Sequence, residues 1–354
     1  MNFTNVHLIA NGARTPLGPA AAPSAAAVRA LMRAAVEHPF MIGVSGEPIV
    51  GALEPRLDPK MMGSGRLLAL AEAAIAEACL PLQTSGGSRP RLPLHLALPE
   101  IRPGFTARDI EAIRSGIAQF EKTASHISRV NVFPHGHAGG AMALKAGAEQ
   151  IRQGAAEACL IGGVDSYFQP DTLGWLDENR QLVGPASRSG FIPGEGAGFC
   201  LLANDRLRDR LGDPGSLRVR SIAIENEPKL IKTEDTCLGE GLSASVRDVA
   251  SDLRLPDERI NAIYCDINGE RYRATEWGFV CLRLSHYFDD PTSYVSPAEC
   301  WGDVGAASIP LFAMLASEAA RRGYSRGPRS LLWGSSEAGQ RGAVVLEAVA
   351  SDRS

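Results

Sequence analysis

One segment, residues 130–166, constrains the fold of this chain more than any other. The run Val130–Phe133 is β-branched and apolar, as in a buried strand, and a Pro-His-Gly turn follows it. From about His137 the sequence is rich in Gly and Ala, which predicts a helix whose backbone packs closely against its neighbours. A second apolar run, Ala158–Gly162, predicts another buried strand. Strand, helix and strand in this order indicate an α/β protein.

The rest of the chain repeats this alternation of strands and helices. Strands are expected at Val6–Ala10, Leu94–Leu98, Val130–Phe133, Ala158–Gly162, Gly198–Leu202, Arg218–Glu225, Ala262–Asp266, Ser293–Val295, Ser330–Trp333 and Ala343–Ala348. Helices are expected at Ser24–Glu37, Gly65–Ala78, Thr106–Phe120, Gly139–Gln153, Ser243–Leu253, Glu276–Phe288 and Gly305–Arg322. The charged stretch Asp205–Ser216 separates two segments with a similar order of elements, so we expect two halves, 1–205 and 217–354.

The composition is that of an ordinary soluble protein, with 45% hydrophobic and 21% charged residues. A net charge of −4 gives no electrostatic reason to expect a nucleic acid or an anionic membrane as a partner. The seven cysteines are widely spaced and include no Cys-x-x-Cys pair, so neither a disulfide framework nor a zinc knuckle is expected. The first residues lack the basic segment and apolar run of a secretory signal, so we expect a cytoplasmic protein. No cofactor is predicted.

Five segments of the chain together resemble the β-ketoacyl synthases. The segment 131–166 is similar to the nucleophile helix of that family and its flanking strands. Asn11–Gly18 is similar to the N-terminal strand and turn of the family, and Gly190–Gly198 is similar to its Gly-Glu-Gly-Ala hairpin. Ile263–Glu270 is similar to its first histidine loop, and Trp333–Leu346 is similar to its closing strand pair. Because the matches keep their order over nearly the whole chain, the resemblance implies a duplicated thiolase fold. In that fold two similar α/β halves pack as αβαβα layers.

The catalytic groups that the resemblance implies are missing from this sequence. Counted back from Ile151, the position of the nucleophilic Cys falls on His137. The first catalytic His position falls on Asn268, and the second falls near Gly302. The C-terminal half has a single histidine, His286, which lies outside both loops. Condensation needs a thiolate that holds the acyl group and imidazoles that stabilise the enolate and its oxyanion, so the chain is predicted to be a pseudo-enzyme.

A vestigial site is expected at the positions of the missing groups. Its members are His137, Asn268 and Gly302, with His135, Glu270, Asp303 and Glu337 nearby. His135 and His137 would form a proton-transfer pair or an anion site, or they fill the vacated position with polar groups, the interpretation that we favour. The polar cluster 266–277 is either a site or a set of self-compensating ion pairs. No metal site is predicted, because the carboxylates that would join His137 are not locally spaced.

Three kinds of function follow from the resemblance. The first is a non-catalytic partner or scaffold, similar to the chain-length factors that pair with active ketosynthases or to the ketosynthase-like accessory proteins of some secretion loci. The second is a degenerate acyltransferase that uses His137, Asn268 and Glu270 on acyl-CoA or on acyl carrier protein. The third is a protein that only binds an acyl group or a metabolite. We expect a homodimer through the strand Val130–Phe133, or a heterodimer with a related ketosynthase, and the further partners considered are acyl carrier protein and a secretion-system component.

Overall fold

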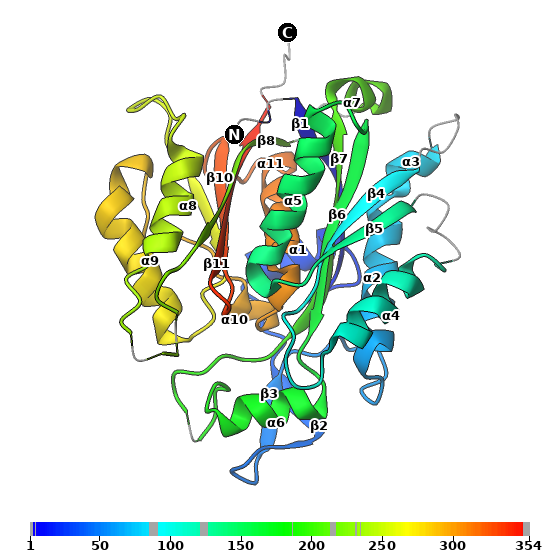
Figure 1. Cartoon of the computed structure of the whole chain (residues 1–354), viewed down its shortest axis with the longest axis vertical. Coiled ribbons are helices and arrows are strands. Elements are labelled where there is room, and N and C mark those ends of the chain that lie inside the picture. The colour runs from blue at the N-terminus through cyan, green and yellow to red at the C-terminus, as the bar shows by residue number, and fades with distance from the viewer. Residues whose placement is uncertain are drawn as a thin grey trace.

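One mixed sheet of nine strands forms the framework of the computed structural model, which describes residues 3, 5–84, 91–120, 127–185, 187–212, 217–230, 232–233 and 235–349. The strand order is β5-β4-β6-β7-β1-β8-β11-β10-β9. The bounds are β1 Val6–Arg14, β4 Leu92–Ala97, β5 Ile127–Phe133, β6 Ala158–Ser166, β7 Glu195–Asn204, β8 Leu217–Asn226, β9 Ala262–Cys265, β10 Arg329–Ser335 and β11 Gln340–Ala348. Two residue pairs of the described chain, His7 with Arg218 and Leu8 with Leu217, join β1 to β8. At this narrow junction the sheet divides into an N-terminal and a C-terminal part (Figure 1).

Helices form three layers around the two parts of the sheet. Helices α5 (Gly136–Arg152) and α11 (Ser308–Arg321) lie between the parts and contact both. Helices α2 (Gly63–Ala78) and α4 (Ala107–Ile117) cover the outer face of the N-terminal part. The outer face of the C-terminal part is covered by α8 and α9, with bounds Glu240–Ala250 and Arg271–Leu284. The layers therefore follow the order αβαβα, which confirms the fold class that the sequence predicted.

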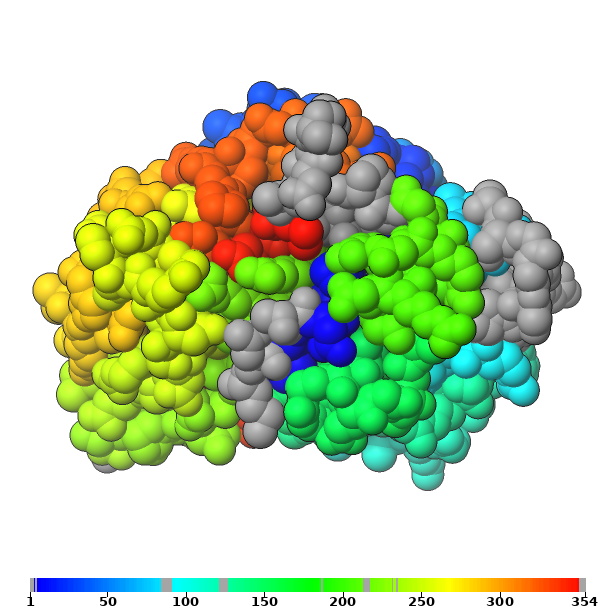
Figure 2. Space-filling model, turned by 90° about the horizontal axis from the view of Figure 1, so that it is seen from above, coloured from blue at the N-terminus to red at the C-terminus, as the bar shows by residue number. Residues whose placement is uncertain are grey.

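The two parts of the sheet repeat one strand order. The N-terminal part has the order β5-β4-β6-β7-β1. Counted in chain order within this part, the third strand lies outermost and is followed by the second, fourth, fifth and first. The C-terminal part has the order β9-β10-β11-β8, and a parallel bridge from Tyr264 to Val295 adds the missing outermost position. Figure 2 shows the halves side by side from above, with the C-terminal half in yellow and orange and the N-terminal half in green and cyan. The division into 1–205 and 217–354 remains our proposal, and residues 213–216 of the expected boundary lie outside the described residues.

The glycines of α5 explain how this helix fits between the two parts of the sheet. A Cβ atom on Gly139 would lie 3.0 Å from the Phe133 carbonyl oxygen, and one on Gly147 would lie 2.3 Å from the Ile161 side chain. A Cβ atom on Gly140 would lie 2.7 Å from Pro310 in α11. Larger residues at these positions would force the packed backbones apart. The close helix packing predicted from the Gly- and Ala-rich sequence is therefore present.

The expected helix Ser24–Glu37 is wrong in its second half. Helix α1 spans Ala21–Arg29, and Leu31 then adopts the left-handed φ of 55°, which a continuing helix does not allow. Residues of the predicted helix beyond this point enter β2 (Val36–Ile42), which pairs with β3 (Pro48–Gly51). The Ala-rich start predicted a helix correctly, but local propensity does not report this strand pairing.

Other differences concern short elements. Helix α6 (Pro170–Glu178) was not predicted, and it packs with the β2–β3 hairpin in a lobe below the sheet (Figure 1). The expected strand Ser293–Val295 is reduced to the single bridge at Val295. The expected Gly-Glu-Gly-Ala hairpin is instead the start of β7, which pairs with β6 and β1. The remaining short helices are α3 Leu80–Thr84, α7 Asp205–Leu211, α10 Ala298–Trp301 and the 3₁₀ turns Ser285–Tyr287 and Gly305–Ala307. In the described chain, every helix is too short or too polar to span a bilayer.

Candidate functional site

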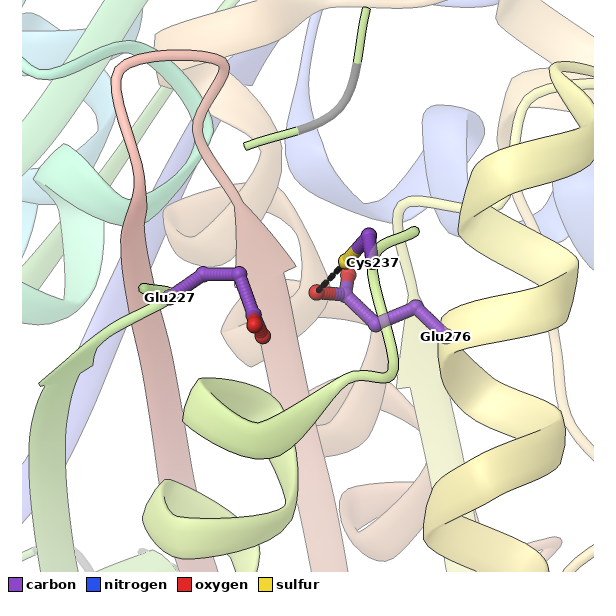
Figure 3. A group of neighbouring side chains, drawn as sticks. All are labelled: Glu227, Cys237 and Glu276. Atoms are coloured by element: carbon purple, nitrogen blue, oxygen red, sulfur yellow. Dashed lines mark hydrogen bonds between the residues drawn. The ribbon is translucent and has the colours of Figure 1, made fainter. Parts of the chain in front are cut away.

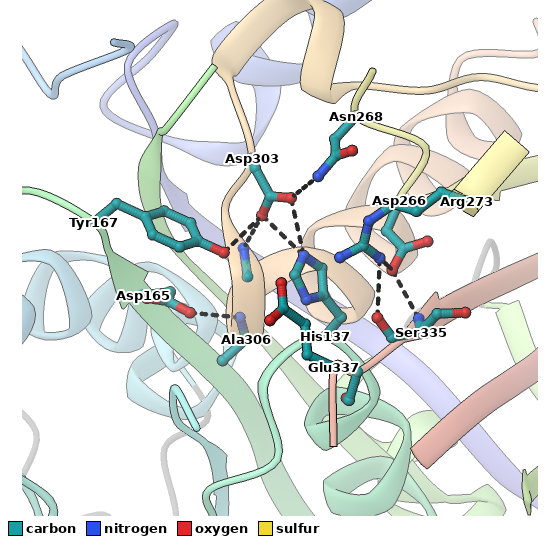
Figure 4. Close-up of polar contacts among 12 residues, drawn as sticks. His137, Asp165, Tyr167, Asp266, Asn268, Arg273, Asp303, Ala306, Ser335 and Glu337 are labelled. Atoms are coloured by element: carbon teal, nitrogen blue, oxygen red, sulfur yellow. Dashed lines mark hydrogen bonds and ion pairs between the residues drawn. The ribbon is translucent and has the colours of Figure 1, made fainter. Parts of the chain in front are cut away.

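His137 is the second residue of α5, and its imidazole is held by a carboxylate from the other half of the chain. Gly136 before it has a φ of +54°, a left-handed turn conformation that glycine adopts without a steric penalty. The Nε2 atom of His137 lies 2.9 and 3.0 Å from the two carboxylate oxygens of Asp303 (Figure 4). Both residues are buried. The pair therefore joins the start of the inner helix α5 to the loop after α10.

Asp303 is the centre of the polar network at this site. Its carboxylate accepts hydrogen bonds from Asn268 Nδ2 at 2.6 Å and from the Tyr167 hydroxyl at 3.2 Å. The backbone N–H of Gly305 donates a further bond at 2.8 Å. With His137, four residues from four different segments converge on one carboxylate, as Figure 4 shows. A buried carboxylate with this many donors is satisfied as an anion.

The charges of the pair support each other against the cost of burial. Burial by itself lowers the pKa of His137, but the carboxylate of Asp303 outweighs that effect and the pKa is raised above 6.5. Burial raises the pKa of Asp303, but the His137 imidazole and the Arg273 guanidinium hold that pKa well below its ordinary value. His137 and Asp303 therefore form an ion pair below the raised pKa of the histidine.

A cavity of about 250 Å³ lies beside the imidazole of His137. Its lining residues are Glu100, Ile101, Arg102, Gly136, His137, Asp165, Tyr167, Trp175, Leu176, Phe191, Gly305 and Glu337. Arg102 donates to Asp165 at 2.6 Å, and its guanidinium lies 4.2 Å from the centre of the Tyr167 ring. The wall is thus a mixture of paired polar groups and apolar side chains. It is not the apolar tunnel that a long acyl chain would require.

A second network next to the site consists of ion pairs. Arg273 Nη1 donates to Asp266 at 2.5 Å and to the Ser335 carbonyl at 2.9 Å, and its Nε lies 3.4 Å from Glu270. The backbone N–H of Ser335 also donates to Asp266, at 2.7 Å. Arg273 and Asp266 are buried. Of the two open interpretations of the 266–277 cluster, the geometry favours self-compensating ion pairs.

Comparison with known proteins relates this geometry to a family. A model of the β-ketoacyl synthase N-terminal domain matches residues 136–207, which contain α5, β6, α6 and β7. A comparison with curated protein sequences gave no match. Among solved structures, a type II PKS acyl-carrier protein in complex with its ketosynthase, bound to the hexaketide, superposes with a TM-score of 0.76 at 15% sequence identity. The alignment covers 98% of this chain and 99% of that chain.

Two further solved structures have the same architecture. The ishigamide ketosynthase/chain length factor has a TM-score of 0.75 at 16% identity, with 98% of this chain and 99% of that chain covered. A β-ketoacyl synthase from Burkholderia phymatum has a TM-score of 0.69 at 14% identity, with 99% and 100% covered. This chain has the thiolase fold of these ketosynthases, and its segment 136–207 is similar to the β-ketoacyl synthase N-terminal domain. At these identities the structural likeness establishes the fold alone.

The ketosynthase-like fold brings four predicted site residues, His137, Asn268, Glu270 and Asp303, into contact. His137 and Asn268 both bond to Asp303, and Glu270 lies 3.3 Å from Asn268 Nδ2. Glu337 lines the cavity and pairs with Lys232. The predicted polar groups therefore pair with one another, but the cavity beside them is not filled.

Gly302 is not the residue that faces His137. It has no side chain, its φ is +75°, and a Cβ atom there would lie 2.9 Å from the Cα of Gly194. Asp303, one position later, supplies the group that contacts His137. The assignment of the second histidine position near Gly302 stays a prediction, and the turn there directs the side chain of Asp303 into the site.

His135 has a different role from the histidine pair that the sequence suggested. It precedes α5, is half-buried, and its backbone carbonyl accepts a hydrogen bond from the Ser336 hydroxyl. The same Ser336 hydroxyl accepts from the N–H of Ala138 at 2.9 Å. Position 135 thus helps to fix the start of the helix through its backbone.

Four polar or charged residues of the cavity lining were not among the predicted site residues. They are Glu100, Arg102, Asp165 and Tyr167. Asp165 closes the Gly-Gly-Val-Asp end of β6, a strand-end position that is typical of α/β sites and was the one available signal. Arg102 and Tyr167 lie in loops, where their approach to Asp303 depends on contacts between distant segments.

The cysteines near the site do not offer a replacement nucleophile. Burial raises the pKa of Cys265 well above its ordinary value, and its thiol points to the Val295 carbonyl oxygen at 3.6 Å. Burial also raises the pKa of Cys200 to about 12. A buried thiol with a raised pKa has little thiolate to react.

Proposed function

We propose that this ketosynthase-like protein does not catalyse condensation and acts as the non-catalytic partner of an active ketosynthase, in the manner of a chain-length factor. The observation that carries the proposal is the contact of His137 Nε2 with Asp303 at 2.9 Å, at the position where the family is expected to place its thiol. An imidazole in that place has no sulfur to hold an acyl group as a thioester. In this proposal the fold is retained for assembly and the catalytic groups are lost.

The identity of residue 303 also supports the proposal. Condensation requires donors aimed at the oxygen that becomes negative in the transition state. A carboxylate, Asp303, stands one residue after the position near Gly302 where the resemblance places the second imidazole, and its pKa is held low by His137 and Arg273 against the effect of burial. An anionic Asp303 would repel a developing oxyanion and would raise the barrier to reaction.

The purified protein is expected to show no detectable malonyl-dependent chain elongation. Any residual rate is expected to be several orders of magnitude below the rate of an active ketosynthase measured in parallel. Intact-mass spectrometry after incubation with acyl-CoA or acyl-carrier-protein thioesters is expected to show no covalent adduct. His137→Cys alone is expected to leave elongation absent, because Asn268 and Asp303 still replace the imidazoles. Elongation by the unaltered protein would overturn the proposal.

A second candidate is an acyltransferase or thioesterase that uses the His137–Asp303 pair as a base. The cavity of about 250 Å³ beside His137 favours it, since a scaffold has no need for that space. An imidazole oriented by a carboxylate is the usual arrangement for activating water or a hydroxyl nucleophile. Hydrolysis or transfer of a thioester in the same incubation, lost in His137→Gln, would support this candidate over the scaffold.

The partner surface that we propose is the free edge of β5. Among the described strands β5 pairs only with β4, so one edge of the sheet is open to another chain. Val132 packs against the core of the N-terminal half, whereas Ser128 and Arg129 are exposed. The proposed complex is a homodimer or a heterodimer with a related ketosynthase through this edge.

Light scattering at micromolar concentration is expected to give a dimer, alone or with the related ketosynthase. The double variant Ser128→Asp/Arg129→Asp is expected to shift it to monomer, because like charges would meet across the two-fold axis. Lys229→Asp, a charge change on an exposed loop of the C-terminal half, is the control and is expected to leave the dimer intact. A monomer under all conditions, or a dimer that survives the double variant, would contradict this surface.

Binding of other proposed partners can be measured by the same light-scattering experiment. One solved structural neighbour is a ketosynthase in complex with an acyl-carrier protein, which makes acyl carrier protein a candidate for this chain. A secretion-system component is the alternative to a ketosynthase at the β5 edge. The cytoplasm remains the proposed location.

A further inference from the structure

Three metal-ligating side chains lie together in the C-terminal half, and none of them lines the His137 cavity. They are Glu227, just after β8, Cys237, in the loop before α8, and Glu276, on α9. One oxygen or sulfur atom from each lies within 4.8 Å of the other two (Figure 3). The Sγ atom of Cys237 lies 3.9 Å from Glu276 Oε1. Three separate segments of the chain therefore present their ligand atoms to one point.

Glu227 provides a second, independent observation at this point. Its side chain is 4% exposed, and Oε2 accepts the Gly241 N–H at 2.9 Å. Within the described chain its other oxygen, Oε1, is buried without a hydrogen-bond partner. A buried carboxylate oxygen left unpaired costs free energy unless a cation or a donor satisfies it. In Figure 3 the carboxylate extends toward the space shared with Cys237 and Glu276.

The charges around this point do not balance without a cation. Glu276 is paired with Arg341, whose Nε donates to Oε1 at 2.6 Å, and both side chains are fully buried. Glu227 adds a second buried carboxylate, so the two acids and one guanidinium leave one negative charge. If Cys237 is also a thiolate, a divalent cation brings the sum of the four side chains and the ion to zero.

We infer that Glu227, Cys237 and Glu276 bind a zinc ion. On binding, the thiol of Cys237 releases its proton to solvent and a Zn–S bond forms, without any change of oxidation state. Thiolate with carboxylates suits zinc, whereas magnesium and calcium take oxygen ligands and avoid sulfur. Bonds of about 2.0–2.3 Å would draw the ligand atoms closer together than the separations of up to 4.8 Å in the present structure.

The surroundings fit a structural role for this zinc site. A Cβ atom on Gly239, whose φ is +63°, would lie 2.9 Å from the Glu276 carbonyl oxygen, so the loop of Cys237 lies directly against α9. Half-buried Cys237 provides the path of entry. Among the described residues Arg341 Nη2 is also buried without a hydrogen-bond partner, and a water as fourth zinc ligand would supply an acceptor there. The ion would tie the end of β8 and the loop before α8 to α9.

The test uses the whole chain, freed of metal by a chelator and titrated with Zn²⁺ and with Co²⁺. The wild-type protein is expected to bind one zinc per chain, to gain melting temperature on doing so, and to show a thiolate-to-cobalt charge-transfer band with Co²⁺. Cys281→Ser is the matched control, because Cys281 is another half-buried thiol, on α9, and contacts the Pro291 carbonyl oxygen. It is expected to behave as the wild type.

Cys237→Ser is expected to lose the charge-transfer band. Glu227→Gln keeps an oxygen for the Gly241 N–H, and it is expected to weaken zinc binding by more than about 100-fold, since groups one step removed from a metal already contribute roughly 10–100-fold. Absence of zinc binding by the wild type, a cobalt spectrum without the band, or zinc affinity unchanged in Glu227→Gln would each overturn the inference. If Cys237→Ser does not fold, the wild-type spectrum and Glu227→Gln still decide the outcome.

Discussion

Arg66→Met is expected to lower the free energy of unfolding by about 3–5 kcal/mol, because it breaks a buried ion pair and leaves one charge behind. Arg66 donates from Nε and Nη2 to the two oxygens of Glu195 at 2.5 and 2.6 Å. Both side chains are at most 1% exposed. Its Nη1 also donates to the backbone carbonyls of Asp58 and Met61, which would lose their partner. The pair joins α2 to the start of β7.

Urea denaturation of wild type and variant measures this effect, and Arg114→Met is the matched control. Arg114 makes the same bidentate contact with Glu111, but both side chains are about half exposed to solvent. An exposed pair is screened by water, so the control is expected to leave the unfolding free energy nearly unchanged. Adding Glu195→Gln to Arg66→Met is expected to recover part of the loss. Equal effects of Arg66→Met and Arg114→Met would refute a role for burial.

The fold was predictable from the sequence where local pattern and packing agree. The apolar strand before α5, the small residues inside it and the strand after it are contiguous, so one short segment reports both the elements and their close approach. The Gly-rich segment 190–198 shows a case in which the local sequence does not determine the strand pairing. Its resemblance to the family implied a hairpin, but whether β7 pairs within that segment or with distant β1 and β6 is decided by contacts between segments far apart in the sequence.

The candidate site was predictable only in part, for the same reason. Counting along α5 placed His137 at the start of that helix, where the structure also has it, since a helix keeps its register. The loop after α10 has no such register, and the turn at Gly302 moved the contact to Asp303. Arg102 and Tyr167 reach the cavity from loops whose sequences have no distinctive spacing, so they were missed. Helical positions could be assigned by counting, whereas loop positions needed the structure.

Asp303 links the two halves of the chain in a way that neither half alone would reveal. Its carboxylate, in the C-terminal half, accepts bonds from His137 and Tyr167 in the N-terminal half and from Asn268 in its own half. Asp303 also bonds across the halves through its backbone, since its N–H donates to the Ile192 carbonyl at 2.7 Å. Asp303 therefore supplies a buried polar contact between the two halves of the chain.

Asp303→Asn is expected to lower the free energy of unfolding by on the order of 3 kcal/mol, although the side chain keeps its size. The contacts of the Asp303 side chain are all with donors, namely His137 Nε2, Asn268 Nδ2, the Tyr167 hydroxyl and the Gly305 N–H. An asparagine offers one oxygen and an NH₂ group, so at least one of these donors would face another donor. Urea denaturation at about pH 6 measures the loss, and an effect as small as that of Arg114→Met would contradict the central role of Asp303.

The pH dependence of this loss tests the ion pair itself. The pKa of His137 is raised above 6.5 although burial opposes the shift, so its contribution to stability is fully present below pH 6.5 and is lost as pH rises through the raised value. The pKa of Asp303 is held below 3.8, so its contribution is lost only in strong acid. The difference in unfolding free energy between wild type and Asp303→Asn should therefore be largest between the lowered pKa of Asp303 and the raised pKa of His137, and should shrink as pH rises through the pKa of His137. His38 is expected to give a pH dependence of stability with the opposite sign, because burial lowers its pKa. The wild type should therefore lose stability relative to His38→Gln as pH falls. A difference for Asp303→Asn that stays constant or grows with rising pH would show that His137 and Asp303 are hydrogen-bonded without charge.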